Sequence, residues 1–148
     1  MSDQKNGLAE KVVKRLMVED KFSQWLGIEV LEVAFGYSKI KMTIREEMIN
    51  GFGIAHGGIA FSFADSAFAF ACNSNGKITV ALDVSISFPK ALKVGDVITA
   101  EAKEINKTNR TGLYLIEVKN QHDDLVALFK GTCFRTEKDL MPQTSNGA

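Results

Sequence analysis

The chain has 148 residues, the size of one domain whose core is large enough to fold unaided. Its 18 Lys and Arg balance its 18 Asp and Glu, so no net field attracts nucleic acid or an anionic membrane surface. The two cysteines, Cys72 and Cys133, lie in apolar stretches without metal-ligand spacing, which argues against a zinc site and favours two reduced, buried thiols over a disulfide.

The first predicted element is a short amphipathic helix over residues 9–18. Apolar residues recur there at helical spacing, and Lys and Glu occupy the opposite face. Three apolar residues are expected to continue its packing until Gly27 ends it: Phe22, Trp25 and Leu26. The N-terminus is polar and has no apolar run of the kind that signals secretion, and no apolar stretch is long enough for a bilayer. We therefore expect a cytoplasmic protein.

Period-two alternation begins at Ile28 and predicts strands over 28–34 and 39–44, joined by a turn at Phe35-Gly36. A glycine-rich loop follows over 48–58. The segment 59–72 is almost continuously apolar and ends in Asn and Gly, which predicts a buried helix with a firm stop.

Four further strands complete the predicted fold, and the cleanest alternation lies in the first of them. They cover 78–88, 97–105, 112–119 and 125–135. Short turns between strands indicate an antiparallel sheet, and a sheet curling around the central helix explains why that helix lacks a broad polar face. The predicted class is α+β. The predicted organisation is an N-terminal helical segment (1–22), the main domain (23–135) and a polar, frayed tail (136–148).

The polar side chains of the predicted central helix lie on one narrow seam. Ser62, Asp65 and Ser66 stand at positions i, i+3 and i+4, which share one side of a helix. An ionised carboxylate in an apolar segment is costly unless it is paired, and burial raises its pKa toward the range useful to a general base. We expect Asp65 to be catalytic; the alternative is a structural hydrogen bond to a neighbouring loop or interface.

His56-Gly57-Gly58 stands at the entrance of this helix. Backbone N–H groups at a helix start are uncovered and lie at the positive end of the dipole, which suits a polarised carbonyl, although paired glycines also serve close packing. From a start at Gly57, Asp65 would lie about 12 Å along the axis, at about 1.5 Å per residue. One carbonyl cannot touch both groups of one helix. Catalysis by this pair therefore requires two subunits with antiparallel helices.

A longer motif surrounds these residues: Asn50-Gly51, His56-Gly57-Gly58, Phe61, Ala64-Asp65-Ser66-Ala67-Phe68-Ala69 and Ala71-Cys72-Asn73-Ser74. It resembles the signature of hotdog-fold thioesterases, with the phenylacetate-degradation (PaaI-like) type as the closest branch. The resemblance covers roughly 25–135. It implies a hotdog fold, in which an antiparallel β-sheet wraps around a central α-helix.

The resemblance also implies roles for individual residues. Asp65 would be the general base or the nucleophile at the thioester carbon, and the Gly57 N–H of the partner subunit would polarise the carbonyl. Asn50 and His56 would line the site and position the carbonyl and the attacking water. Further substrate contacts are expected at Gly58, Phe61 and Ser66.

Coenzyme A carries phosphates, so a neutral chain must supply local cations. Four basic residues in the later turns are candidates, with solvated charges as the alternative: Lys90, Lys93, Lys107 and Arg110. Of these, Lys90 and Arg110 are the predicted contacts. Three aromatic residues are available for an apolar acyl pocket, although each also suits the core: Phe52, Phe61 and Phe68.

The predicted function is hydrolysis of an acyl-CoA thioester to free acid and CoA, with no metal and no cofactor beyond the CoA of the substrate. An aryl-acyl group such as phenylacetyl or hydroxyphenylacetyl is expected. The alternatives are a hydroxybenzoyl, naphthoyl or medium-chain fatty acyl group, or a non-catalytic acyl-CoA-binding protein. Asp65 argues against the last, because binding gains nothing from an acid facing a thioester. A homodimer or homotetramer with the site across the subunit interface is expected, without a nucleic-acid or membrane partner.

Overall fold

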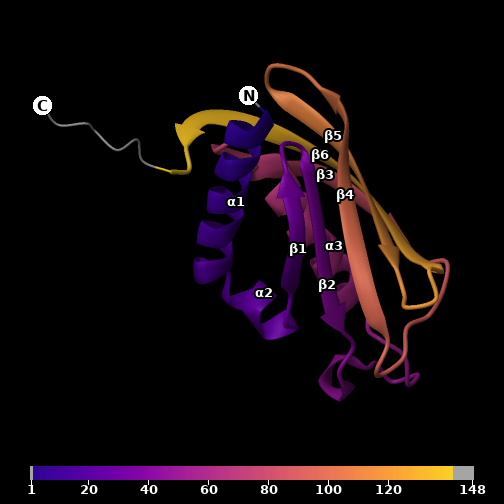
Figure 1. The fold of residues 1–148 in the computed structure, drawn as a ribbon. Helices are drawn as coiled ribbons and strands as arrows, with labels where there is room; N and C mark the ends of the chain where they lie inside the picture. The colour runs from indigo at the N-terminus through magenta and orange to yellow at the C-terminus, as the bar shows by residue number, and fades with distance from the viewer. Residues whose placement is uncertain (1, 142–148) are drawn as a thin grey trace, which may run out of the picture.

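The computed structural model describes residues 2–141. In chain order its elements are α1 (Ser2–Glu19), α2 (Lys21–Leu26), β1 (Glu29–Ala34), β2 (Tyr37–Thr43), the 3-10 turn η1 (Glu46–Met48), α3 (Gly57–Asn73), β3 (Lys77–Ser87), β4 (Val97–Lys107), β5 (Thr111–Lys119) and β6 (Leu125–Asp139). All six strands form one antiparallel sheet in the order β1-β2-β4-β5-β6-β3, and the sheet curves around α3 (Figure 1). The predicted sheet wrapped around a central helix is confirmed.

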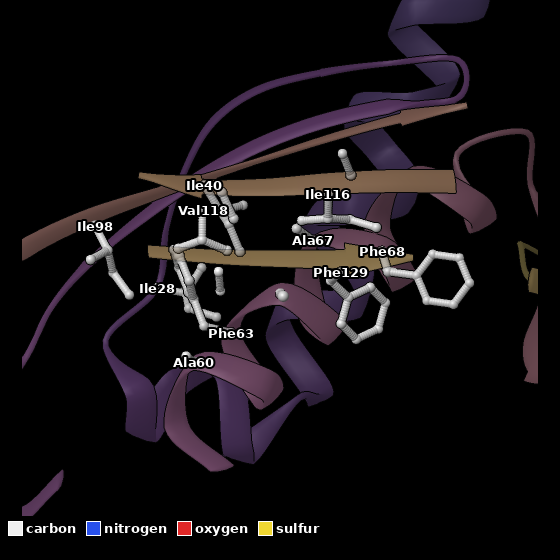
Figure 2. Close-up of a cluster of buried hydrophobic side chains, with 14 of the residues drawn as sticks. Ile28, Ile40, Ala60, Phe63, Ala67, Phe68, Ile98, Ile116, Val118 and Phe129 are labelled. Carbon is white, nitrogen blue, oxygen red and sulfur yellow. The ribbon is translucent and has the colours of Figure 1, made fainter. Parts of the chain in front are cut away.

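The core lies between α3 and the concave face of the sheet (Figure 2). Every second side chain of the inner strands points at the helix, as the period of a β-strand requires. Phe68 of α3 is 1% exposed, and a Cβ built at Gly131 of β6 would lie only 2.8 Å from its ring. Gly131 therefore lets an aromatic side chain of the helix lie directly against the sheet.

The N-terminal helices differ from the prediction in extent. Helix α1 begins at Ser2, seven residues before the predicted start, because residues 2–8 are mostly exposed and polar and so show no apolar period. Helix α2 is separate from α1 and spans the predicted boundary between residues 22 and 23. The predicted stop is confirmed: Gly27 ends α2 in the left-handed conformation at φ 78°. In the described part of the chain, no helix combines the length and apolar character needed to cross a membrane.

Strand β3 forms as predicted, but its apolar residues do not all face one side. The pairing with β6 shifts register between Ala81 and Asp83, so one extra residue forms a β-bulge. Beyond the bulge Val84 and Ile86 pack against the core. Before it, three apolar side chains are exposed on the edge strand: Ile78, Val80 and Leu82. A bulge reverses the alternation, and the sequence pattern carries no sign of it.

The C-terminal strand is longer than predicted. Residues 136–139, expected to fray, continue β6 and pair with the start of β3, where Lys77 Nζ lies 2.6 Å from the Asp139 carboxylate. The rest of the predicted tail, 142–148, lies outside the described residues. Cys72 and Cys133 are both buried and free, as predicted.

Candidate active site at the entrance of the central helix

Helix α3 begins at Gly57 because His56 caps it. The backbone of His56 is extended, at φ −60° and ψ 136°, and its Nδ1 accepts the Gly58 N–H at 2.9 Å. Since Nδ1 is an acceptor here, the proton of a neutral ring must sit on Nε2, which leaves Nε2–H as a donor for another group. The cap thus fixes both the start of the helix and the tautomer of His56.

The preceding loop is closed on itself by Asn50. Its side-chain oxygen accepts the Phe52 N–H at 2.9 Å, and its backbone N–H donates to the Ile54 carbonyl at 2.8 Å. These bonds fold the loop back toward His56, whose own N–H donates to the Met48 carbonyl at 2.8 Å. Asn50 therefore shapes the entrance through its side-chain oxygen.

Gly57 keeps its backbone N–H unpaired. Gly58 donates to the His56 ring and Ile59 to the His56 carbonyl, whereas Gly57 meets no acceptor among residues 2–141. The first N–H groups of a helix have no partner within the helix, and they lie at the positive end of its dipole. Of the two glycines in the motif, Gly57 is therefore the one that offers a free donor.

A pocket of about 210 Å³ brings four predicted site residues together: Asn50, His56, Gly57 and Lys90. Phe88 forms part of its wall, and a Cβ built at Gly57 would lie 3.4 Å from the Phe88 ring. Lys90 pairs with Asp124 across the mouth of the β5–β6 turn. Four of the residues predicted for the site therefore lie together within a single chain.

A second cavity, of about 400 Å³, borders His56 and Gly58. Phe22 and Trp25 of α2 form an aromatic wall, with ring centroids 5.8 Å apart. Arg45 lies over the Trp25 ring at 5.1 Å and donates to the carbonyl oxygens of Trp25 and Leu26 at 2.6 and 2.9 Å. Arg45 thereby fixes the C-terminal end of α2 beside the helix entrance.

The aromatic residues considered for an acyl pocket lie away from both cavities, and Phe68 and Phe61 take the alternative role of packing in the interior. Phe68 is in the core, Phe52 is 90% exposed on the loop, and Phe61 packs against Phe129 with centroids 5.5 Å apart. All three border neither cavity. The wall residues Phe22 and Trp25 were interpreted from sequence only as helix-packing residues.

Asp65 lies on α3 eight residues after Gly57 and lines neither cavity. The carboxylate is half-buried, and no group among residues 2–141 donates a hydrogen bond to it. Burial, and secondly the negative charge of Asp20, raise the pKa of Asp65 above its ordinary value. The observed start of α3 confirms the premise of the sequence argument, that about 12 Å of helix, at about 1.5 Å per residue, separate Gly57 from Asp65.

Ser66 lines neither of the two cavities. Its hydroxyl is buried and lies 2.8 Å from the hydroxyl of Ser23, which donates to Asp20 at 2.6 Å. Sequence reasoning overlooked Asp20 and Ser23. The spacing Asp-x-x-Ser before an apolar run is a helix-cap pattern and was the available signal.

Arg110 is not brought to the pocket. Its guanidinium pairs with Glu137 at 3.2 Å in the β4–β5 turn, whereas Lys90 pairs with Asp124 after the far end of β5. A nine-residue strand at about 3.3 Å per residue separates the two ends by roughly 30 Å. Within one chain the structure therefore does not bring Lys90 and Arg110 together, and their contacts with a CoA phosphate stay a prediction.

The helix cap allows the structural role of His56 to be tested separately from its functional role. His56→Ala should lower the free energy of unfolding by about 1 kcal/mol, because the Gly58 N–H loses its acceptor. His56→Asn retains an acceptor oxygen near the Nδ1 position and should keep wild-type stability, while both variants lose Nε2–H and turnover. Denaturant unfolding and steady-state kinetics measure these effects. Equal destabilisation by Ala and Asn would contradict the cap.

No three His, Cys, Asp or Glu side chains within residues 2–141 gather closely enough to hold a metal ion. The groups available for chemistry at the helix entrance are a free N–H, an imidazole N–H and, further along the helix, an unpaired carboxylate. This set suits polarisation of a carbonyl and activation of water.

Comparison with known proteins gives a consistent result. Residues 52–127 match the model of the thioesterase superfamily. A protein of Archaeoglobus fulgidus is 44% identical over 138 residues, which cover 93% of this chain and 90% of that protein. The acyl-coenzyme A thioesterase PaaI of Escherichia coli is 40% identical over 116 residues, covering 78% and 83%. A solved structure of E. coli PaaI aligns with a TM-score of 0.89 at 36% identity, covering 90% of this chain and 97% of that one.

Proposed function

This chain belongs to the thioesterase superfamily and is an acyl-CoA thioesterase, and we propose that it cleaves an aryl-acyl-CoA to free acid and CoA. Phenylacetyl- and hydroxyphenylacetyl-CoA are the proposed substrates. The similarity to PaaI, whose solved structure is described as a protein of a phenylacetic acid degradation operon, supports this acyl class. The proposal includes a cytoplasmic location and needs no metal or redox cofactor.

The proposed chemistry uses the two unpaired groups of α3. The Gly57 N–H, with Nε2–H of His56, donates to the thioester oxygen, so the carbonyl carbon becomes more electrophilic. An Asp65 carboxylate takes a proton from the attacking water, or attacks the carbon itself to form a mixed anhydride that a water molecule then hydrolyses to the free acid. In either case the C–S bond breaks, and the CoA thiolate leaves and takes up a proton. The free Gly57 N–H beside an imidazole-lined pocket is the observation that carries this assignment.

We propose that Asp65 and Gly57 of one site come from two subunits. Eight residues of one helix separate them, so a single carbonyl cannot contact both. Strand β3 supports such an assembly, because it is an edge strand that exposes apolar side chains, with Leu82 60% exposed. Antiparallel pairing of two β3 edges would bring two α3 helices side by side in opposite directions. The proposed unit is a homodimer or a homotetramer built from it.

The second cavity supports the aryl specificity. Its wall of stacked Phe22 and Trp25 borders His56 and Gly58, directly beside the proposed oxyanion donor. A planar aromatic acyl group can stack on such a wall, and a saturated chain gains less from it. Lys90 at the first pocket remains the proposed cation for a CoA phosphate. To bind the phosphate, its ammonium group would leave its ion pair with Asp124.

Release of free thiol from a panel of acyl-CoAs tests this proposal. We expect phenylacetyl- and hydroxyphenylacetyl-CoA to give the highest kcat/KM, above hydroxybenzoyl-, naphthoyl- and octanoyl-CoA. Trp25→Leu should lower kcat/KM for the aryl substrates about tenfold, the cost of one stacking contact of roughly 1 kcal/mol or a little more, and change octanoyl-CoA little. A preference for octanoyl-CoA would overturn the aryl assignment. Tight binding of acyl-CoA without hydrolysis of any thioester would overturn the assignment of catalytic activity.

A further inference from the structure

A partly buried chain of hydrogen bonds connects α2 to the helix that carries Asp65. Asp20 caps α2: its carboxylate accepts the Ser23 backbone N–H at 2.9 Å and the Ser23 hydroxyl at 2.6 Å. The Ser23 hydroxyl, which is 0% exposed, lies 2.8 Å from the Ser66 hydroxyl, and Ser66 is 8% exposed. Ser66 is the residue next to Asp65, so the chain ends beside the proposed base.

This arrangement fixes one carboxylate near another. Two bonds from Ser23 hold Asp20 in one orientation, and the Ser23–Ser66 contact fixes α2 against α3. Like charges held close together disfavour the ionised form of both, and a structure keeps them together only where other contacts compensate. Asp20 accepts two hydrogen bonds from Ser23, whereas Asp65 has no donor within residues 2–141, and after burial the charge of Asp20 is the second cause that raises the pKa of Asp65.

The surroundings of α3 supply no competing charge. Several elements pack on α3 near Asp65. Among their residues within 2–141, Asp20 at the α1–α2 junction is the charged group that affects the pKa of Asp65. The other titratable neighbour is the Cys72 thiol, two turns further along α3. A hydrogen bond to Cys133 and burial raise the pKa of that thiol, which therefore stays neutral. Among residues 2–141, no cation offsets the effect of Asp20 on Asp65.

We propose that Asp20 is a positioning residue for the hydrolysis: held by Ser23 and Ser66, its negative charge makes Asp65 a stronger base at neutral pH. The inference rests on the proposed function, in which Asp65 is the base. It extends that function by assigning a role to a residue on a different element, outside both pockets. Asp20 does not touch the substrate and acts only through Asp65.

The test uses Asp20→Asn, because Asn caps a helix as well as Asp and lacks the charge. The acidic limb of the kcat/KM–pH profile should move to lower pH by about 0.5–1 unit, since one nearby negative charge is removed. Carboxyl-carbon NMR titration of Asp65 should show the same displacement. Asp20→Ser, a second uncharged cap, repeats the test if the Asn variant folds poorly. Glu19→Gln removes the same charge from an exposed neighbour and should leave both titrations unchanged.

The outcomes separate this inference from the proposed function. If Asp65→Asn retains activity, Asp65 is not the base, yet the NMR titration still shows whether Asp20 acts on it. The role of Asp20 is overturned if neither the Asp65 titration nor the acidic limb differs between the wild type and the variants Asp20→Asn and Asp20→Ser. An equal displacement in Glu19→Gln would also overturn it, because the effect would then belong to net charge.

Discussion

Replacement of Asp65 by Asn is expected to lower kcat by about 10²–10⁴-fold, the range that positioned general acid–base groups supply. The amide fills the same space but can neither take a proton from water nor attack the thioester. KM should change little, because Asp65 lines neither pocket beside the helix entrance. Thiol release at saturating substrate measures the effect. Ser62→Ala, on the same face of α3, is the matched control and should retain turnover.

The same substitution should stabilise the fold at neutral pH. Asp65 carries an unpaired, half-buried charge near Asp20, and its folded-state pKa is raised. A raised pKa means that the associated stability is present below the unfolded-state pKa and is lost as pH rises through the folded value. Asp65→Asn should therefore gain about 1 kcal/mol or less at pH 8, after allowance for partial exposure, and nothing at pH 3. Unchanged activity together with unchanged stability would exclude Asp65 as the strained base.

Removal of the Gly57 N–H is expected to lower kcat by about 10²–10³-fold, as loss of one oxyanion donor does elsewhere. Gly57→Pro achieves this with little change of backbone, because Gly57 is the first residue of α3, where Pro is favoured. His56 is already extended, the conformation that a following Pro requires. Gly57→Ala keeps the N–H and places its Cβ in ordinary contact with Phe88, so it should stay active.

Mixing the two inactive variants tests the shared site. In a hybrid of Asp65→Asn and Gly57→Pro chains, one of the two sites combines an intact Asp65 with an intact Gly57. Random pairing makes half of the dimers hybrid, so about one quarter of the wild-type activity should return. Native mass spectrometry counts the hybrids. Hybrids that form normally and remain inactive would show that both groups act within one chain.

Much of the fold could be predicted because its signals are local. The alternation in β2 and β5 and the continuous apolar run of α3 follow directly from which faces are buried. The errors arose where pairing between distant strands determines how far an element extends. Strand β6 continues to Asp139 because β3 pairs with it there. Residues 2–8 became helical as an exposed extension of α1, without any apolar pattern to reveal it.

The candidate site was predictable where one short segment builds it. Asn50, His56 and Gly57 lie within eight residues, and their loop and cap bonds are local. Contributions from distant segments escaped prediction. Phe88 and Lys90 reach the pocket after β3, Phe22 and Trp25 come from α2, and Arg110 lies at the end of β5 opposite Lys90. Which end of a strand a turn occupies depends on topology, and composition does not encode it.

The bulge in β3 divides one alternating sequence into two parts that face opposite sides of the sheet. Val84 and Ile86 complete the core of their own chain, whereas Ile78, Val80 and Leu82 are exposed in a single chain. A newly folded monomer would therefore have an exposed apolar edge strand, which tends to associate with other chains until a second copy covers it. In the proposed dimer the lifetime of that monomer depends on protein concentration. Dilution would then lower the active fraction, because it separates the dimers and exposes this edge again.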